Sequence, residues 1–265
     1  MKIPTVIPAL VRNLYKLIPL FVFFVIFSTS VFADSRSDFD FQYSKYRQSY
    51  SEFSLYKTDY LSTSSLDNQQ KALLAAKQAI STRDLTKASF AAYIRDLIAQ
   101  NKLKYEPLLP VSAWLLESQQ FFLNEASKGQ SVVTMANLND FDTKYNESFL
   151  KYEKYLKVGV VAQKVAKLKN LSLQQQNALN AQKAKMPETV SVRVTERIAL
   201  LESELTLISE KIDSMANFLI SDEGMDNSDS EVFFTSKIDQ LIEIRELQLS
   251  WMDKLIDLDL NYAKI

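Results

Sequence analysis

The stretch VTERIALLESELTLISEKIDSMANFL, residues 194–219, has the most regular helical pattern in this chain. Its apolar residues recur at alternating steps of four and three, which is typical of a helix that packs along one seam against partner helices. The seam residues are Val194, Ile198, Leu201, Leu205, Ile208, Ile212, Met215 and Leu219. Pro187 and Glu188 suit the first turn of a helix. The sequence therefore predicts a helix from about 187 to 220, about 50 Å long at 1.5 Å per residue.

Composition extends the helical prediction to the rest of the chain. The 265 residues include only three glycines. Average usage is about 7%, and sheet proteins with many tight turns need more glycine than this chain has. We therefore predict an all-α fold, an elongated antiparallel bundle of about five to seven helices with coiled-coil-like heptad packing.

An aromatic stripe marks the first predicted helix after residue 33. Its rings step by four and three, so we expect most of them to lie in the interhelical core. Tyrosine rings also suit stacking on a glycan or peptide, or contact with a bilayer surface. The stripe comprises Phe39, Tyr43, Tyr46, Tyr50, Phe53 and Tyr60, with Phe41 and Tyr56 off the line.

The next predicted segment, 66–104, is one long helix or two helices joined near 81–84. Its first half carries a stripe of small residues suited to close helix approach: Ala72, Ala75, Ala76 and Ala79. Asp84 either caps a second helix or lies in an exposed polar turn inside a continuous one.

The middle of the chain contains Pro107 and Pro110, after which we expect a short helix from about 111 to 126 that ends near Gly129. If the chain has a boundary between sub-units of the fold, it falls near 127–135. A long helix follows from about 136 to 185, with a bend expected at Gly159 or in the polar run 174–177.

The last predicted helix, about 230 to 262, follows an acidic turn at 221–229 and has two apolar sets. The set predicted to face inward is Ile238, Leu241, Ile242, Leu249, Met252 and Ile256. A second set, which suggests a second buried face, is Trp251, Leu255, Leu258 and Tyr262.

Residues 1–33 have the three-part layout of a secretory signal peptide. Lys2, Arg12 and Lys16 precede an apolar run, and Val31 and Ala33 are small residues of the kind that a signal peptidase accepts. The alternative is an uncleaved helix at 17–33 that anchors the chain in a membrane. Both interpretations make 34–265 an extracytoplasmic helical bundle.

The residue types exclude several functions. Cleavage after Ala33 would leave a net charge near −4, which provides no basic surface for nucleic acid. The chain has no histidine and no cysteine, so the usual general base, zinc ligands and thiolate nucleophiles are missing. We predict no catalytic, cofactor-binding or metal-binding residues. Paired carboxylates, or serine with lysine, are what an enzyme would have left.

One acidic segment, 222–231, has oxygen ligands that calcium would accept. They are Asp222, Glu223, Asp226, Asn227, Asp229 and Glu231. Their spacing does not fit an EF-hand loop, so we interpret the segment as a solvated connection between long helices.

The stretch KALLAAKQAISTRD at 71–84, followed by YIRDL at 93–97, resembles exported all-helical proteins of ultra-small, candidate-phylum bacteria. The aromatic stripe before it is similar in texture. The resemblance implies a bacterial cell-envelope location and no particular activity.

Three hypotheses follow for the function. The first is a non-enzymatic structural or interaction protein of the cell envelope, with a protein partner and, if uncleaved, membrane attachment through 17–33. The second is an extracytoplasmic ligand-binding module that uses the aromatic face of the first mature helix. The third is a carboxylate-dependent hydrolase.

Overall fold

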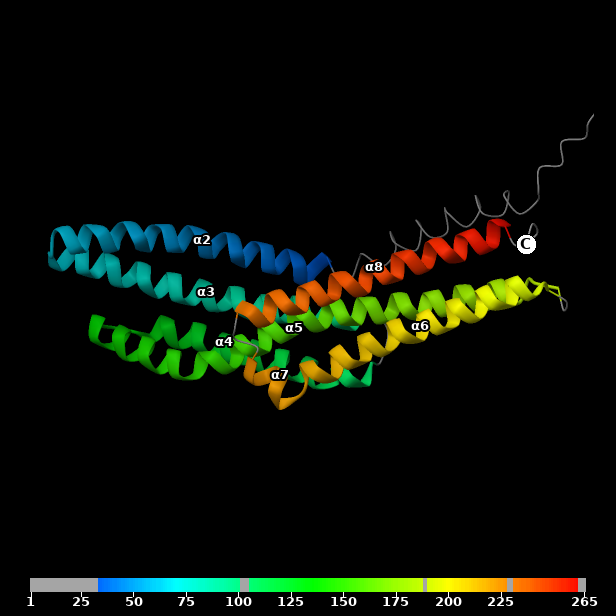
Figure 1. The fold of residues 1–265 in the computed structure, drawn as a ribbon. Coiled ribbons are helices and arrows are strands. Elements are labelled where there is room, and N and C mark those ends of the chain that lie inside the picture. Colours follow the sequence, from blue (N-terminus) through cyan, green and yellow to red (C-terminus); the bar gives the residue numbers. More distant parts are fainter. Residues whose placement is uncertain (1–32, 101–104, 188–189, 228–230, 262–265) are drawn as a thin grey trace, which may run out of the picture.

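The computed structural model describes residues 33–100, 105–187, 190–227 and 231–261. Within these ranges the chain is an elongated all-α bundle, as predicted (Figure 1). The elements are α2 (Ala33–Ser62), α3 (Leu66–Gln100), the 3₁₀ helix η1 (Glu106–Leu108), α4 (Leu109–Ser131), α5 (Met135–Lys183), α6 (Val192–Leu219), α7 (Asp222–Asn227) and α8 (Glu231–Asn261). The first 32 residues of the predicted 1–33 export segment lie outside the described residues.

The 49-residue helix α5 joins the two ends of the molecule (Figure 1). Helices α2, α3 and α4, with the first part of α5, form what we call the N-terminal half. Helices α6 and α8, with the last part of α5, form the C-terminal half. One continuous cluster of buried apolar side chains runs through both, from Ala88 to Leu258. The connection at 132–134 falls within the predicted boundary region, and a separation of folding units there stays a prediction.

Close helix approach shapes the N-terminal half. The predicted small-residue stripe on α3 is buried at all four alanines. On α4, a Cβ added to Gly129 would lie 2.5 Å from Ile80 Cγ2 of α3. Gly129 therefore permits contact between α3 and α4, whereas we expected it to end the helix, and α4 continues to Ser131.

Helix α3 runs without interruption through 81–84. Both interpretations of Asp84 were wrong. It lies in the middle of a continuous helix, so it is not a cap, and its side chain is fully buried in the protein interior rather than exposed. The hydroxyls of Thr82 and Thr86 donate to carbonyls one turn earlier, at 2.8 and 2.7 Å, so these polar residues are satisfied within the helix.

The aromatic stripe on α2 has a different register from the one predicted. Tyr43 and Tyr50 are 47% and 55% exposed, so they do not lie in the core. Gln42 and Ser49 occupy the inward positions, and Tyr56 rejoins the inner line. The inner line is Phe39, Gln42, Tyr46, Ser49, Phe53, Tyr56 and Tyr60, with steps of three and four in the opposite order.

The two halves meet at Gly159 of α5. A Cβ added there would lie 2.7 Å from Leu115 Cδ2 of α4 and 3.3 Å from Ile94 Cγ2 of α3. Glycine thus lets three helices converge. Helix α5 begins at a cap, where the Thr134 hydroxyl accepts a hydrogen bond from the backbone N–H of Asn137 at 3.1 Å. It continues as one helix through Gly159 and through 174–177.

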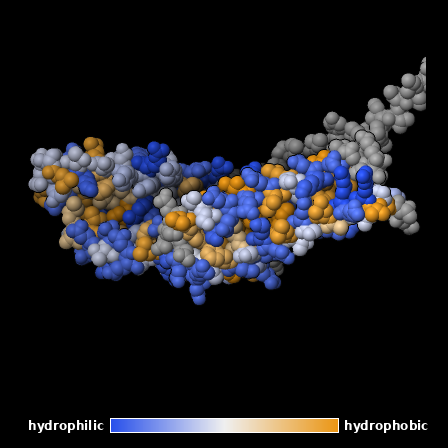
Figure 2. All heavy atoms as spheres, viewed as in Figure 1, coloured by the Kyte–Doolittle hydropathy of each residue, from blue (hydrophilic) through white to orange (hydrophobic). Residues whose placement is uncertain are grey.

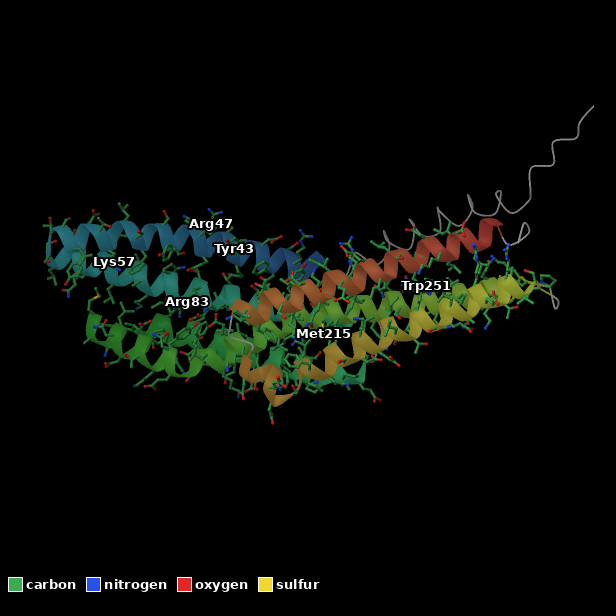
Figure 3. All side chains as sticks on the ribbon, viewed as in Figure 1. Tyr43, Arg47, Lys57, Arg83, Met215 and Trp251 are labelled. Atoms are coloured by element: carbon green, nitrogen blue, oxygen red, sulfur yellow. The ribbon has the colours of Figure 1, made fainter. Side chains whose placement is uncertain are left out.

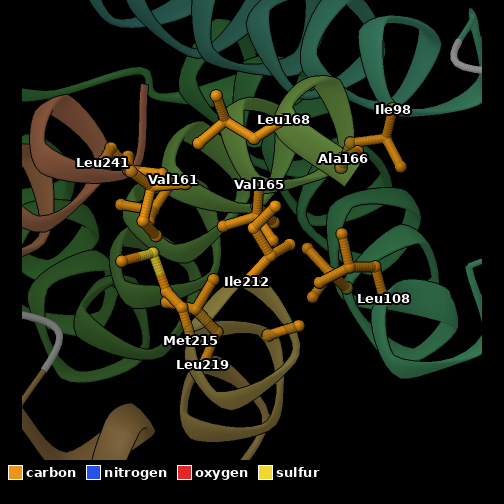
Figure 4. Packing of buried hydrophobic residues seen from close by; sticks show 14 of the residues in the cluster. Ile98, Leu108, Val161, Val165, Ala166, Leu168, Ile212, Met215, Leu219 and Leu241 are labelled. Atoms are coloured by element: carbon orange, nitrogen blue, oxygen red, sulfur yellow. The ribbon is translucent and has the colours of Figure 1, made fainter. Parts of the chain in front are cut away.

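The apolar seam of α6, from Val194 to Leu219, packs as predicted. Seven of its eight residues are buried, and Ile198 is half-buried. Figure 4 shows Ile212, Met215 and Leu219 of α6 against Val161 and Val165 of α5. The helix begins at Val192 rather than near 187, because Ser191 accepts a hydrogen bond from the Val194 N–H and caps it there.

Helix α8 buries the second of its two predicted apolar sets. Trp251, Leu255 and Leu258 are buried, together with Leu241, Ile244 and Gln248. Most of the set predicted to face inward points outward: Ile238, Ile242, Leu249 and Ile256 are 41–53% exposed. That prediction was wrong for these four residues, and Tyr262 lies outside the described residues.

The acidic turn is partly helical, since 222–227 form the short helix α7. Among the helices that the structure describes, none combines the length and apolarity needed to cross a membrane.

Candidate functional site

A groove with aromatic walls lies between α2, α3 and the start of α5, and we call it the aromatic groove. It encloses about 380 Å³. Its lining residues are Tyr46, Tyr50, Phe53 and Lys57 of α2, Ala76, Ala79, Ile80 and Arg83 of α3, and Leu138, Asn139 and Asp142 of α5. Lys57 and Arg83 are labelled in Figure 3. Three residues of the predicted aromatic stripe are thus brought together with residues that the sequence did not single out.

The sequence explains the walls and floor of the groove. Tyr46 and Phe53 lie on the inner line of α2, and Tyr50 lies beside that line. The centres of the Tyr46 and Tyr50 rings are 5.9 Å apart. The floor includes Ala76 and Ala79, whose short side chains leave space. Tyr43, at the other end of the predicted stripe, does not line the groove.

Beneath the groove lies a buried charge cluster formed by Arg83, Asp84, Lys87 and Tyr145. The Arg83 guanidinium donates to both carboxylate oxygens of Asp84, Nε to Oδ1 at 2.9 Å and Nη2 to Oδ2 at 3.1 Å. The Tyr145 hydroxyl donates to Asp84 Oδ1 at 3.0 Å, and Lys87 Nζ donates to that hydroxyl at 3.0 Å. The guanidinium carbon also lies 4.1 Å from the centre of the Tyr145 ring.

Burial controls protonation in this cluster. It raises the pKa of Asp84, although the neighbouring Arg83 and Lys87 charges act in the opposite direction. Burial, and then the Arg83 charge, lower the pKa of Lys87 to about 8. Burial and the negative charge of Asp84 raise the pKa of Tyr145. Each of the three shifts has burial as its largest cause, because Asp84 is fully buried and its partners surround it.

The charge cluster ties helices together rather than presenting reactive groups. Lys87 Nζ lies 3.8 Å from the centre of the Phe149 ring, so its charge faces an aromatic surface as well as its hydrogen-bond partner. Asp84, the acid whose pKa is raised, is fully buried and saturated by Arg83 and Tyr145, so a substrate has no access to it. Arg83 alone is shared with the aromatic groove.

A serine and a lysine do come together in the C-terminal half, beside Asp213. Lys169 Nζ donates to the two carboxylate oxygens of Asp213 at 2.7 and 2.8 Å and to Ser209 Oγ at 2.8 Å. An ammonium group has three donors, and all three are used. A serine nucleophile needs a base that accepts its proton. Lys169 donates to Ser209, and the Ser209 hydroxyl donates to Asp213 Oδ2 across 3.5 Å, which is long for such a bond. Tyr105 also donates to Asp213, which ties η1 to α6.

The acidic segment 222–231 is described only in part, because 228–230 lie outside the described residues. Over the ranges that are described, no group of three or more acidic side chains is placed to hold a metal ion. Helix α7 carries Asp222 and Glu223 in its first turn, where negative charges interact favourably with the helix dipole.

No protein-family model matches this chain, and neither a curated protein nor a solved structure matches it. The function is therefore inferred from the sequence and from the geometry of the sites above.

The sequence analysis missed the charge cluster. Its signal is the polar run from Ser81 to Lys87, which interrupts an alanine-rich helix without ending it. The partner that completes the cluster, Tyr145, is 61 residues from Asp84.

Proposed function

We propose that this chain is an exported, non-enzymatic helical protein that acts in the bacterial cell envelope by binding other proteins. One observation carries the proposal. An elongated bundle leaves four large apolar side chains exposed along one line of α8, in addition to Val232 near its start, and exposed apolar surface of this kind marks interaction sites. They are Ile238, Ile242, Leu249 and Ile256.

Export is supported by the layout of residues 1–33. A basic start, an apolar run and small residues before position 34 form a signal peptide, or an anchor if the segment is not cleaved. The chain contains no cysteine, so it needs no disulfide formation in an oxidising compartment.

The export proposal is tested by expressing the full chain in a bacterium and sequencing the N-terminus of the fractionated protein. Cleavage predicts a new N-terminus at Asp34 outside the cytoplasm. An anchored form would keep Met1 in the membrane fraction with the bundle accessible to external protease. As a matched control, Ala33→Arg should block cleavage and keep Met1. The intact polypeptide in the cell interior would contradict export.

The interaction role is tested by crosslinking intact cells at the bundle surface and identifying captured proteins. A reproducible envelope partner supports it. Recovery of the uncrosslinked chain alone, at every surface position tried, would contradict it.

A second candidate function is ligand binding in the aromatic groove. The observation that favours it is the convergence of Tyr46, Tyr50 and Phe53 with the partly exposed Arg83, since rings stack on sugars or peptides and a guanidinium donates hydrogen bonds. The test is a binding screen of oligosaccharides and peptides. Tyr50→Ala should abolish binding, whereas Tyr43→Ala, which removes an exposed ring outside the groove, should not. Equal effects of the two variants would contradict this function.

A further inference from the structure

Helix α8 carries two parallel seams: one is buried, and the other is exposed except at Met252, which packs partly against the core. The inner seam packs on α5 and α6. The outer seam is displaced from it by one position and repeats at the same alternating steps of four and three. The outer seam consists of Ile238, Ile242, Arg245, Leu249, Met252 and Ile256. It runs from Ile238 to Ile256, and the 18 steps between them cover about 27 Å at 1.5 Å per residue.

The outer seam has the pattern of a coiled-coil surface. Heptad a positions are Ile242, Leu249 and Ile256, and Ile238, Arg245 and Met252 take the d positions. In the space-filling view of Figure 2, apolar patches alternate with polar ones over the C-terminal half, where α8 lies. A regular stripe of this kind fits one further helix.

Charges along the outer seam identify the chemistry of that helix. Each d position is followed by an exposed acid at the e position: Asp239, Glu246 and Asp253. None of the three makes an ion pair with any residue in the described ranges. By contrast, Glu243 and Asp257, which lie nearer α6, are neutralised by Lys211 at 2.9 Å and Arg197 at 2.8 Å. The acidic edge beside the outer seam is therefore free to pair with an incoming cation.

We propose that the outer seam of α8 docks an amphipathic helix of a partner protein, with lysine or arginine beside an apolar stripe. The inference rests on the proposed interaction function and names its surface. Charges at e positions choose coiled-coil partners, and an acidic edge selects a basic one. Arg245, a charged residue inside the seam, selects an acidic or polar residue opposite it and so fixes the register.

The same charges disfavour two other occupants. In an antiparallel pair of α8 helices from two copies, the e positions face each other, so Asp239, Glu246 and Asp253 would meet identical acids. An anionic lipid surface would also be repelled by this edge.

The test uses the full chain and two synthetic helical peptides with one apolar stripe, flanked by lysine in one and by glutamate in the other. Fluorescence anisotropy should show the lysine peptide binding at least about tenfold tighter than the glutamate peptide, with the difference shrinking at high salt. The triple variant Asp239→Lys, Glu246→Lys, Asp253→Lys should reverse the preference. Equal binding of both peptides, or binding of neither, would overturn the proposal.

Matched variants separate the outer seam from other apolar surface. The double variant Ile242→Ser, Leu249→Ser should bind the lysine peptide at least about tenfold more weakly than the wild type does. The control, Leu200→Ser with Leu207→Ser, removes two similarly exposed leucines of α6 and should leave binding unchanged. Loss of binding in the control alone would place the interaction on α6 and overturn the proposal.

Other occupants would give different results, each of which overturns the proposal. Self-association lost in the outer-seam variant would identify a second copy. Adsorption to anionic vesicles lost in that variant would identify a lipid surface. Peptide binding seen only after residues 1–33 are removed would identify the chain's own N-terminus. These results leave the export and crosslinking tests standing, because those report location and contact through any face.

Discussion

The N-terminal and C-terminal halves share α5, yet they are held by different kinds of side chain. In the N-terminal half, α3 is buried on several sides, and its centre places Asp84 and its partners among aromatic rings. In the C-terminal half, α5, α6 and α8 meet through leucine and isoleucine at heptad spacing. A regular apolar seam therefore joins the helices of the C-terminal half, whereas the N-terminal half also contains a buried set of paired charges.

The C-terminal half also has fully buried polar side chains, and these are uncharged and donate to backbone carbonyls, whereas its ion pairs lie nearer the surface. Gln175 Nε2 donates to the carbonyl of Gln248, and Gln248 Nε2 donates to the carbonyl of Leu168, both at 2.9 Å. Trp251 Nε1 donates to the carbonyl of Leu201 at 2.8 Å. These bonds join α8 to α5 and α6 without placing a charge in the core.

The largest difference between the halves should appear on removing a buried charge. Asp84→Ala leaves Arg83 and Lys87 without their carboxylate, so we expect the free energy of unfolding to fall by about 3–5 kcal/mol. The matched change in the C-terminal half, Asp257→Ala, breaks an exposed pair with Arg197 and should cost less than about 1 kcal/mol. Urea denaturation measures the free energy of unfolding of both variants. Equal losses would contradict the proposed difference between the two halves.

The next effect distinguishes the two seams of α8. Leu255→Ala opens a cavity in the core and should cost about 2–5 kcal/mol. Leu249→Ala, on the outer seam, should change stability by no more than about 0.5 kcal/mol. Thermal or urea unfolding of the pair checks the assignment, and the reverse order of losses would show that α8 is rotated.

A smaller effect tests the junction between the halves. Gly159→Ala should destabilise the fold by about 1 kcal/mol, because the clash with Leu115 outweighs the gain in helix propensity. Leu115→Ala in the Gly159→Ala background should cost less than it does in the wild type, since the new methyl group fills part of the space. Additive losses in this double-mutant cycle would show that the two helices are not in contact there.

The smallest effect is a pH dependence that belongs to the N-terminal half. Below pH 8, Lys87 is charged in both the folded and the unfolded chain, so the cost of burying its charge lowers the free energy of unfolding in full. From pH 8 upward, native Lys87 releases its proton while the unfolded chain keeps it, so the free energy of unfolding should rise with pH. The rise ends near pH 10. Above that pH the raised pKa of Tyr145 makes the free energy of unfolding fall, because tyrosine in the unfolded chain loses its proton first.

We expect this rise to be on the order of 1 kcal/mol between pH 8 and 10, because solvent screens a partly exposed side chain. Lys87→Met should remove the slope. Lys254→Met, in an exposed ion pair of the C-terminal half, should retain it. A slope that survives in Lys87→Met would contradict the assignment to this residue.

The two halves also differ in what the sequence could predict. The α6 seam was predicted because its apolar residues follow one unbroken period. On α2, two registers of opposite step order overlap, and tyrosine tolerates exposure, so the period did not show that Tyr43 and Tyr50 face outward. On α8, both seams have the same period, and only packing against α5 and α6 decides which is buried.

The candidate sites were less predictable than the helices. The aromatic groove depends on α5 approaching α2, and the charge cluster depends on Tyr145 reaching Asp84 across 61 residues. Local spacing contains no information about such contacts. An acid in the middle of a helix is ordinarily solvated, so its burial becomes visible only once its partners are placed.

Hydrogen exchange of the Asp84→Ala variant, resolved helix by helix, tests most directly whether the halves are held by different interactions. We expect protection to fall in α3, α4 and the first part of α5, while α6 and α8 keep their wild-type protection. An equal loss of protection in both halves, or a loss that begins in α8, would contradict this expectation.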